Sequence, residues 1–174
     1  MAMGGSIDVD SALGEGTAFI VRLPLAWEVG SRSAEDEAAA AWASLPPQRV
    51  LLVEDDPTIA AVIRGLLEVH GHQVSHAAHG LAALAEVSAS EFDVALLDLD
   101  LPGLDGIGLA RQLQTMGYDM PLVAVTARSD ADAEPTARAA GFADFLRKPV
   151  TAQMLLESIA AVLAAQRRRR EGLV

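Results

Sequence analysis

Between residues 49 and 166, short apolar runs alternate with amphipathic stretches, and this alternation restricts the fold more than any other feature of the chain. A continuous apolar run is typical of a strand that is covered on both faces, as in a parallel sheet between helices. Apolar residues between the runs recur at helical spacing, for example Ile59, Ile63 and Leu67. The pattern predicts a doubly wound α/β domain with five parallel strands, at residues 50–53, 73–75, 94–97, 122–125 and 143–146.

The residues before this domain differ in composition. Two β-like runs, 6–10 and 18–23, are joined by a loop with two glycines, which predicts a β-hairpin. Two strands alone bury too little surface to be stable, so this hairpin must pack on something or stay mobile. The next stretch is rich in alanine and acidic residues and ends at Pro46-Pro47. The predicted layout is a hairpin (1–27), a partly helical linker (28–48), the α/β domain (49–166) and a basic tail (167–174).

Charge and composition exclude several classes of protein. The chain has 13 basic and 24 acidic residues and a formal charge of −11, which argues against nucleic acid as a partner. It has no cysteine, which excludes disulfides and cysteine-ligated zinc and fits a reducing compartment. No apolar run approaches the ~18 residues of a membrane helix, and residues 1–6 lack the pattern of a signal peptide. We expect a soluble, cytoplasmic protein.

Polar residues that can carry chemistry follow the predicted strands where each strand ends. Glu54 and Asp55 follow the first strand, Asp98 the third, Thr126 the fourth and Lys148 the fifth. In open α/β sheets, ligands bind at this carboxyl edge, and in the strand order 2-1-3-4-5 the first and third strands are neighbours. Glu54, Asp55 and Asp98 are therefore expected to converge.

Three neighbouring carboxylates repel one another unless a cation lies between them. Mg²⁺ is the natural candidate, because it binds through one or two carboxylates together with phosphate oxygens. Asp98 could then act as a nucleophile, with Lys148 and Thr126 binding the phosphoryl oxygens. Cap and strand-end preferences could explain any one of these residues, but they do not explain all five in register. Lys148 is also the only lysine in the chain.

The motifs around these residues resemble those of response-regulator receiver domains. The acidic pair lies in Val53-Glu54-Asp55-Asp56, the phosphoacceptor motif is Leu96 to Gly106, the switch threonine lies in Val125-Thr126-Ala127, and the lysine segment is Arg147-Lys148-Pro149. The resemblance covers about two thirds of the chain and implies a flavodoxin-like fold and two-component phosphorelay signalling. It implies that Asp98 accepts a phosphoryl group from a phosphohistidine, on a histidine phosphotransfer protein or a kinase dimerisation domain.

The resemblance also implies how the metal is held. Asp55 and Asp98 would bind Mg²⁺ directly, Glu54 would bind it through water, and the backbone carbonyl of Asp100 would complete the protein ligands. Lys148-Pro149 would carry a cis peptide bond, which proline makes accessible.

Four residues are implied to control switching and lifetime. Thr126 and Phe145 would form the switch pair, with the hydroxyl moving toward the phosphoryl group while the ring turns inward. Asp100 and Arg128 occupy positions that in the family frame the path of hydrolytic water. We expect Asp100 to set the lifetime of the phosphorylated state.

The N-terminal residues resemble the closing hairpin of a histidine-kinase ATPase domain, in the strings 3–11, 14–19 and 23–25. Kinase tail, linker and receiver in that order describe the carboxyl end of a hybrid sensor histidine kinase. The chain contains no asparagine and lacks the ATP-binding boxes and the catalytic histidine segment, so it has no kinase core. We expect it to be a piece of a longer protein whose receiver promotes its own phosphorylation and dephosphorylation.

Other interpretations remain open at this point. A haloacid-dehalogenase-like phosphatase is the main alternative, because Asp98-Leu99-Asp100 mimics that family's nucleophile and acid pair. Its metal-binding acids come after the lysine, however, whereas Glu54-Asp55 comes first here. A receiver-like interaction module without phosphorylation is disfavoured because every chemical residue is present. The last helices could also pair in a homodimer.

Two further clusters are weaker signals. The histidines at 70, 72, 76 and 79 suggest a metal site, but they straddle a helix end, a turn and a strand, so a solvated surface is the simpler interpretation. The arginines at 167–170 end the last helix, where cations interact favourably with the helix dipole.

Overall fold

The computed structural model describes residues 6–12, 16–22 and 45–172, and the chain divides into two compact units, residues 1–33 and 34–174. In the first unit, β1 (Ser6–Ala12) pairs antiparallel with β2 (Gly16–Arg22), which is the predicted hairpin. The helix predicted in the linker falls outside the described residues. No helix in the described ranges has the length and apolar character needed to cross a bilayer.

The second unit is the predicted doubly wound domain. Its five parallel strands have the order β4-β3-β5-β6-β7, which is the predicted order 2-1-3-4-5. The elements are β3 (Arg49–Val53), α2 (Pro57–Glu68), β4 (Gln73–Ala77), α3 (Gly80–Ala89), β5 (Val94–Leu97), α4 (Gly106–Thr115), β6 (Leu122–Thr126), α5 (Ala133–Ala139), β7 (Asp144–Arg147) and α6 (Ala152–Arg170).

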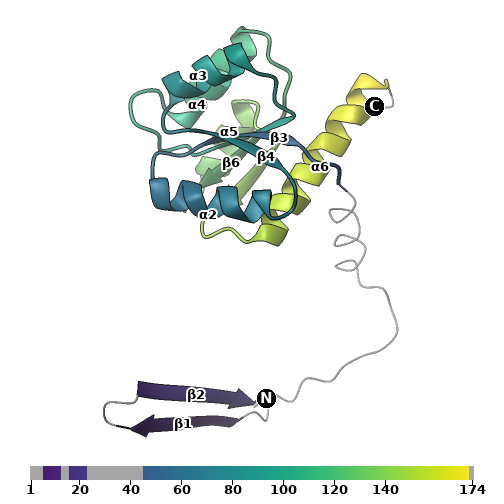
Figure 1. Cartoon of the computed structure of the whole chain (residues 1–174). Helices are drawn as coiled ribbons and strands as arrows, with labels where there is room; N and C mark the ends of the chain where they lie inside the picture. The colour runs from purple at the N-terminus through teal and green to yellow at the C-terminus, as the bar shows by residue number, and fades with distance from the viewer. Residues whose placement is uncertain (1–5, 13–15, 23–44, 173–174) are drawn as a thin grey trace. The chain divides into compact units, whose positions relative to one another are not determined.

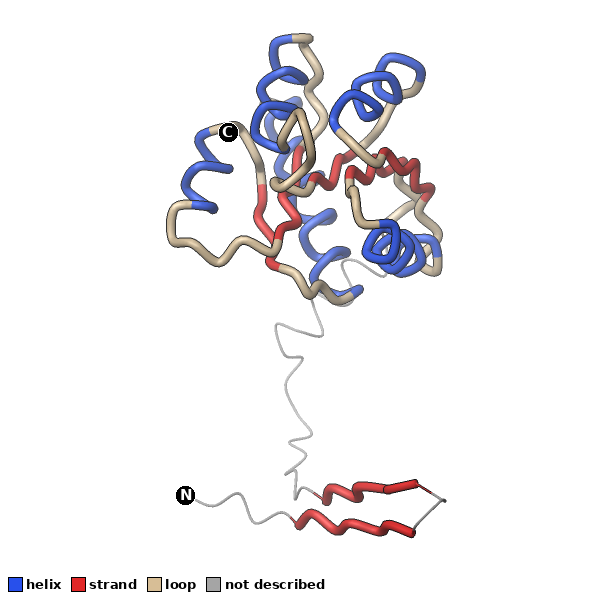
Figure 2. The backbone as a smooth tube through the Cα atoms, turned by 90° about the vertical axis from the view of Figure 1, so that its left-hand side faces the viewer, coloured by secondary structure: helices blue, strands red, loops and turns tan. Residues whose placement is uncertain are grey.

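Helices cover both faces of this sheet, as the continuous apolar strands require (Figures 1 and 2). Successive strand side chains point to opposite faces. Leu52 and Leu96 pack with α2 and α6, whereas Leu51 and Leu97 pack with α3, α4 and α5. The central strands are buried throughout, so the chemistry of the domain is confined to the edges of the sheet.

Side-chain caps set where the helices begin at the carboxyl edge of the sheet. Asp56 accepts hydrogen bonds from the backbone N–H groups of the first turn of α2, and Asp105 and Thr151 cap α4 and α6 in the same way. Each cap ends the loop that follows a strand. The caps therefore hold the loops that carry the candidate site residues.

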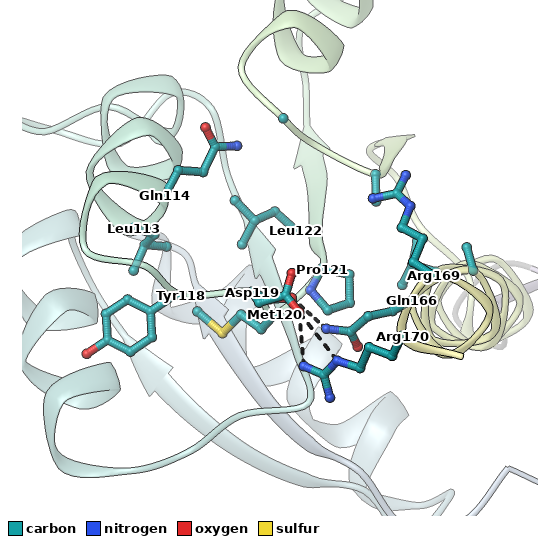
Figure 3. A pocket seen from close by; sticks show the side chains of 14 residues that line it. Leu113, Gln114, Tyr118, Asp119, Met120, Pro121, Leu122, Gln166, Arg169 and Arg170 are labelled. Carbon is teal, nitrogen blue, oxygen red and sulfur yellow. Dashed lines mark hydrogen bonds and ion pairs between the residues drawn. The ribbon is translucent and has the colours of Figure 1, made fainter. Parts of the chain in front are cut away.

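The last helix ends with the arginine run, as predicted, and Arg167–Arg170 form its final turn. Arg170 makes an ion pair of 3.1 Å with Asp119, and the Gln166 side chain donates to the Asp119 carbonyl (Figure 3). These contacts attach the end of α6 to the loop before β6.

Each of the four clustered histidines has its own hydrogen-bond partner. His72 is buried, with 4% of its surface exposed, and its Nδ1 accepts from the Gln48 N–H, which corrects the expectation of a solvated surface at this position. His70 donates to a backbone carbonyl at the end of α2, His76 donates to the Glu54 carbonyl, and His79 caps α3. In the part of the chain that the structure describes, no cluster suited to a metal ion contains a histidine.

Candidate functional site

Three carboxylates converge at the carboxyl edge of the sheet, as the strand order predicts. One oxygen from each of Glu54, Asp55 and Asp98 lies within 4.8 Å of the others. Backbone hydrogen bonds that continue the sheet past the strand ends hold two of them, because the Asp98 N–H donates to Val53 and the Glu54 N–H donates to Ala77. Glu54 and Asp98 are 1% and 6% exposed, whereas Asp55 is exposed.

Lys148 joins the two buried carboxylates. Its Nζ lies 2.6 Å from Glu54 Oε2 and 2.6 Å from Asp98 Oδ2. The Lys148 N–H donates to the Thr126 carbonyl, and the peptide bond to Pro149 is cis, as the resemblance implied. The Lys148 ammonium thus reaches the acidic cluster from the loop after β7, an edge strand that β6 separates from β5.

The electrostatics of this group reflect burial and pairing together. Burial raises the pKa of Glu54, although Lys148 acts in the opposite direction. For Lys148, burial alone would lower the pKa, but the hydrogen bonds and charges of Asp98 and Glu54 together raise it. The lysine is therefore held as an ammonium. Two buried carboxylates share one cation, which leaves the site negative and suited to a further cation.

Asp100, Thr126 and Arg128 form a second group beside the carboxylates. Arg128 Nε donates to Asp100 Oδ1 at 2.7 Å, and Thr126 Oγ1 donates to Asp100 Oδ2 at 3.3 Å. The Asp100 N–H donates to Asp98 Oδ1 at 3.0 Å. Three of the four residues expected to control switching and lifetime therefore contact one another.

Phe145, the other expected switch residue, lies on β7 opposite Ala124 of β6. It is half-buried against the core under α3, α4 and α5, and the Arg147 guanidinium carbon lies 5.9 Å from the centre of its ring. Ala124 and Thr126 are two residues apart on one strand, so Phe145 and Thr126 face the same side of the sheet.

Two residues support the site without having been assigned a role from the sequence. A Cβ at Gly106 would lie 2.2 Å from the Asp98 carbonyl oxygen, so only glycine allows α4 to begin this close to Asp98. The signal was available, because Gly106 closes the quoted phosphoacceptor motif. His76, which donates to the Glu54 carbonyl at 2.8 Å, carries no comparable signal.

A pocket of about 390 Å³ lies elsewhere, among the residues before β6 and β7 and the end of α6 (Figure 3). Because the strands are parallel, residues that precede them lie at the edge opposite the acidic cluster. The pocket contains none of the predicted site residues. Its position separates it from the chemistry described above.

The donor set at the acidic cluster fits Mg²⁺. All three side chains offer hard oxygen ligands. The protein supplies only a few such ligands, which suits Mg²⁺ because waters and phosphate oxygens complete its coordination shell. Within the described residues this is the one group of three or more acids or histidines with such convergence.

Comparisons with known proteins agree with the family resemblance found in the sequence. The model of the family described as response regulator receiver domain matches residues 50–160. Sensor histidine kinase AruS of Pseudomonas aeruginosa is 36% identical over 165 residues, covering 92% of this chain and 16% of that protein. Sensor protein EvgS of Escherichia coli strain K12 is 29% identical over 155 residues, covering 88% of this chain and 13% of that protein.

Both alignments cover more of the chain than the residues from 49 onward can supply, so they extend into the N-terminal residues. Among solved structures, a response regulator receiver domain protein (CheY-like) from Methanospirillum hungatei JF-1 superposes with a TM-score of 0.66. The two sequences are 29% identical, and the match covers 71% of this chain and 99% of that one.

Proposed function

This chain belongs to the response regulator receiver family of two-component signalling, and we propose that it accepts a phosphoryl group on Asp98 in a Mg²⁺-dependent reaction. The observation that carries the proposal is the position of Asp98, which is buried at the carboxyl edge beside Glu54 and Asp55 and hydrogen bonded to the single lysine. The family match supports this signalling role over the phosphatase alternative.

The chemistry is nucleophilic displacement at phosphorus. A carboxylate oxygen of Asp98 forms an O–P bond while the N–P bond of a phosphohistidine breaks, and the electron pair remains on the imidazole nitrogen, which takes up a proton. Hydrolysis reverses the modification, because water attacks phosphorus and releases inorganic phosphate and the Asp98 carboxylate.

The neighbouring residues stabilise the charge that develops on the phosphoryl oxygens. Lys148 already contacts Asp98 and is the residue we assign to bind one of these oxygens, and the Thr126 hydroxyl is assigned to a second. Asp55, Asp98, Glu54 through water and the Asp100 carbonyl would hold Mg²⁺, which supplies positive charge against the phosphoryl oxygens when bound. Phe145 would turn inward as Thr126 moves.

The partners follow from the phosphoryl donor. We assign that role to a phosphohistidine on a histidine phosphotransfer protein or on a kinase dimerisation domain, acting in the cytoplasm. The N-terminal similarity to AruS and EvgS supports a place for this receiver at the carboxyl end of a hybrid sensor histidine kinase.

The test is phosphorylation of the full chain with acetyl phosphate and Mg²⁺, read by intact mass. We expect wild type to gain the mass of one phosphoryl group and the Asp98→Asn variant to gain none. Asp132→Asn is the matched control, because this exposed aspartate makes no capping hydrogen bond and should leave the gain unchanged. Equal labelling of wild type and Asp98→Asn would refute the assignment.

A further inference from the structure

The Thr126 hydroxyl already has a hydrogen-bond acceptor in this structure. Thr126 is fully buried, with 0% of its surface exposed, so its hydroxyl depends on protein partners. It donates to Asp100 Oδ2 at 3.3 Å and accepts from the Arg128 N–H at 3.3 Å. A hydroxyl has one proton and can donate to one acceptor at a time.

We propose that Asp100 is a positioning residue that competes with the phosphoryl group for the Thr126 hydroxyl. This inference rests on the proposed function and adds a form of regulation to it. The Asp100 carboxylate holds the hydroxyl in a resting position, and formation of the phosphorylated state requires the Thr126–Asp100 hydrogen bond to break as a Thr126–phosphoryl hydrogen bond forms.

Arg128 anchors this arrangement. Its Nε donates to the other Asp100 oxygen at 2.7 Å, so the carboxylate is oriented by an ion pair on one side while it accepts from Thr126 on the other. Both side chains are partly exposed, at 39% for Arg128 and 46% for Asp100. The ion pair therefore contributes orientation more than stability.

The arrangement is also tied to the phosphoacceptor. The Asp100 N–H donates to Asp98 Oδ1, so the backbone that carries the competing carboxylate is fixed to the residue that would be modified. The net contribution of Thr126 to the stability of the phosphorylated state is then the free energy of its new hydrogen bond minus the free energy of the hydrogen bond to Asp100 that it gives up.

A double-mutant cycle isolates this competition. Beryllofluoride, which mimics a phosphoryl group on a carboxylate, is titrated with Mg²⁺ into the wild-type 174-residue chain and into its Asp100→Ala, Thr126→Val and double variants. Bound fluoride is followed by ¹⁹F NMR. The affinity of the protein with threonine at position 126, divided by the affinity of the protein with valine there, measures the contribution of the hydroxyl. We expect this ratio to be about fivefold larger when residue 100 is alanine than when it is aspartate. A factor of about five corresponds to one net hydrogen bond.

The cycle separates competition from simple electrostatics. If Asp100 acts only as a nearby negative charge, Asp100→Ala strengthens beryllofluoride binding equally whether residue 126 is threonine or valine. That result would refute the proposed competition. Thr126→Ser keeps the hydroxyl. The ratio of affinities between the proteins with serine and with valine at position 126 should therefore equal the ratio between threonine and valine in the wild-type background. If beryllofluoride does not bind even wild type, or binds Asp98→Asn equally well, the phosphoacceptor assignment fails instead.

Discussion

Removing the ammonium of Lys148 should destabilise the α/β domain strongly when no Mg²⁺ is present. In the Lys148→Met variant, Glu54 and Asp98 keep their burial, with side chains 2% and 8% exposed, but lose the cation that lies 2.6 Å from each. Breaking a buried ion pair by removing one partner costs ~3–5 kcal/mol, because an uncompensated charge stays buried. That loss is a large part of the ~5–15 kcal/mol that stabilises a typical domain.

Urea unfolding followed by circular dichroism at 222 nm measures this loss, because the described helices all lie in the α/β domain. With a urea dependence of ~1–3 kcal/mol per molar, a loss of ~3 kcal/mol lowers the midpoint by ~1–3 M. Arg64→Met is the matched control. Arg64 pairs with Glu68 on the surface, where both side chains are about half exposed, so this change should cost below ~0.5 kcal/mol.

A triple variant identifies the cause of the loss. If the cost arises from orphaned carboxylates, replacing them as well, in Glu54→Gln, Asp98→Asn, Lys148→Met, should recover much of the lost stability. If the cost arises from the lost packing of the lysine stem, the triple variant should be no more stable than Lys148→Met. That second result, or a Lys148→Met midpoint equal to that of Arg64→Met, would refute the reasoning.

Two glycines on helices should respond to alanine in opposite ways. Gly106→Ala places a methyl group against backbone atoms and should lower the free energy of unfolding by ~1–3 kcal/mol. Gly65→Ala places its methyl group in open space on α2 and should raise the free energy of unfolding by ~0.5–1 kcal/mol. Urea midpoints measure both changes. Burial, with the nearby charge of His70, lowers the pKa of His72, so its contribution to stability is present above about pH 6.5 and is lost as the pH falls. Thermal unfolding between pH 7 and pH 5 should therefore depend less on pH in His72→Asn than in wild type, and equal dependence would contradict this assignment.

The fold and the convergence of the acids could be predicted because each depends on local patterns and a general rule. Continuous apolar runs identify strands covered on both faces, and a residue that directly follows a parallel strand must lie at the carboxyl edge. Strand order then brings Glu54 and Asp98 together, although neither is near the other in sequence. The role of Gly106 was missed because its close approach to the Asp98 carbonyl oxygen is formed only when the loop between β5 and α4 is folded.

The contacts within the site depend on distances between segments that the sequence separates. Lys148 is 94 residues from Glu54, and Thr126 is 26 residues from Asp100. The sequence alone indicates that these residues lie at the same edge of the sheet, but the conformation of each loop decides whether their side chains make contact. The same limit explains His72, whose burial depends on the packing of residues 45–48 beside β4.

The sequence by itself determined the class of fold, the edge that carries the chemistry and the residue types gathered there, because periodicity and strand-end position are encoded locally. Only the tertiary structure decided that Lys148 pairs with two carboxylates and that Thr126 already donates to Asp100. Hydrogen bonds require donor and acceptor to meet within about 3 Å. That accuracy comes from the packing of the whole domain.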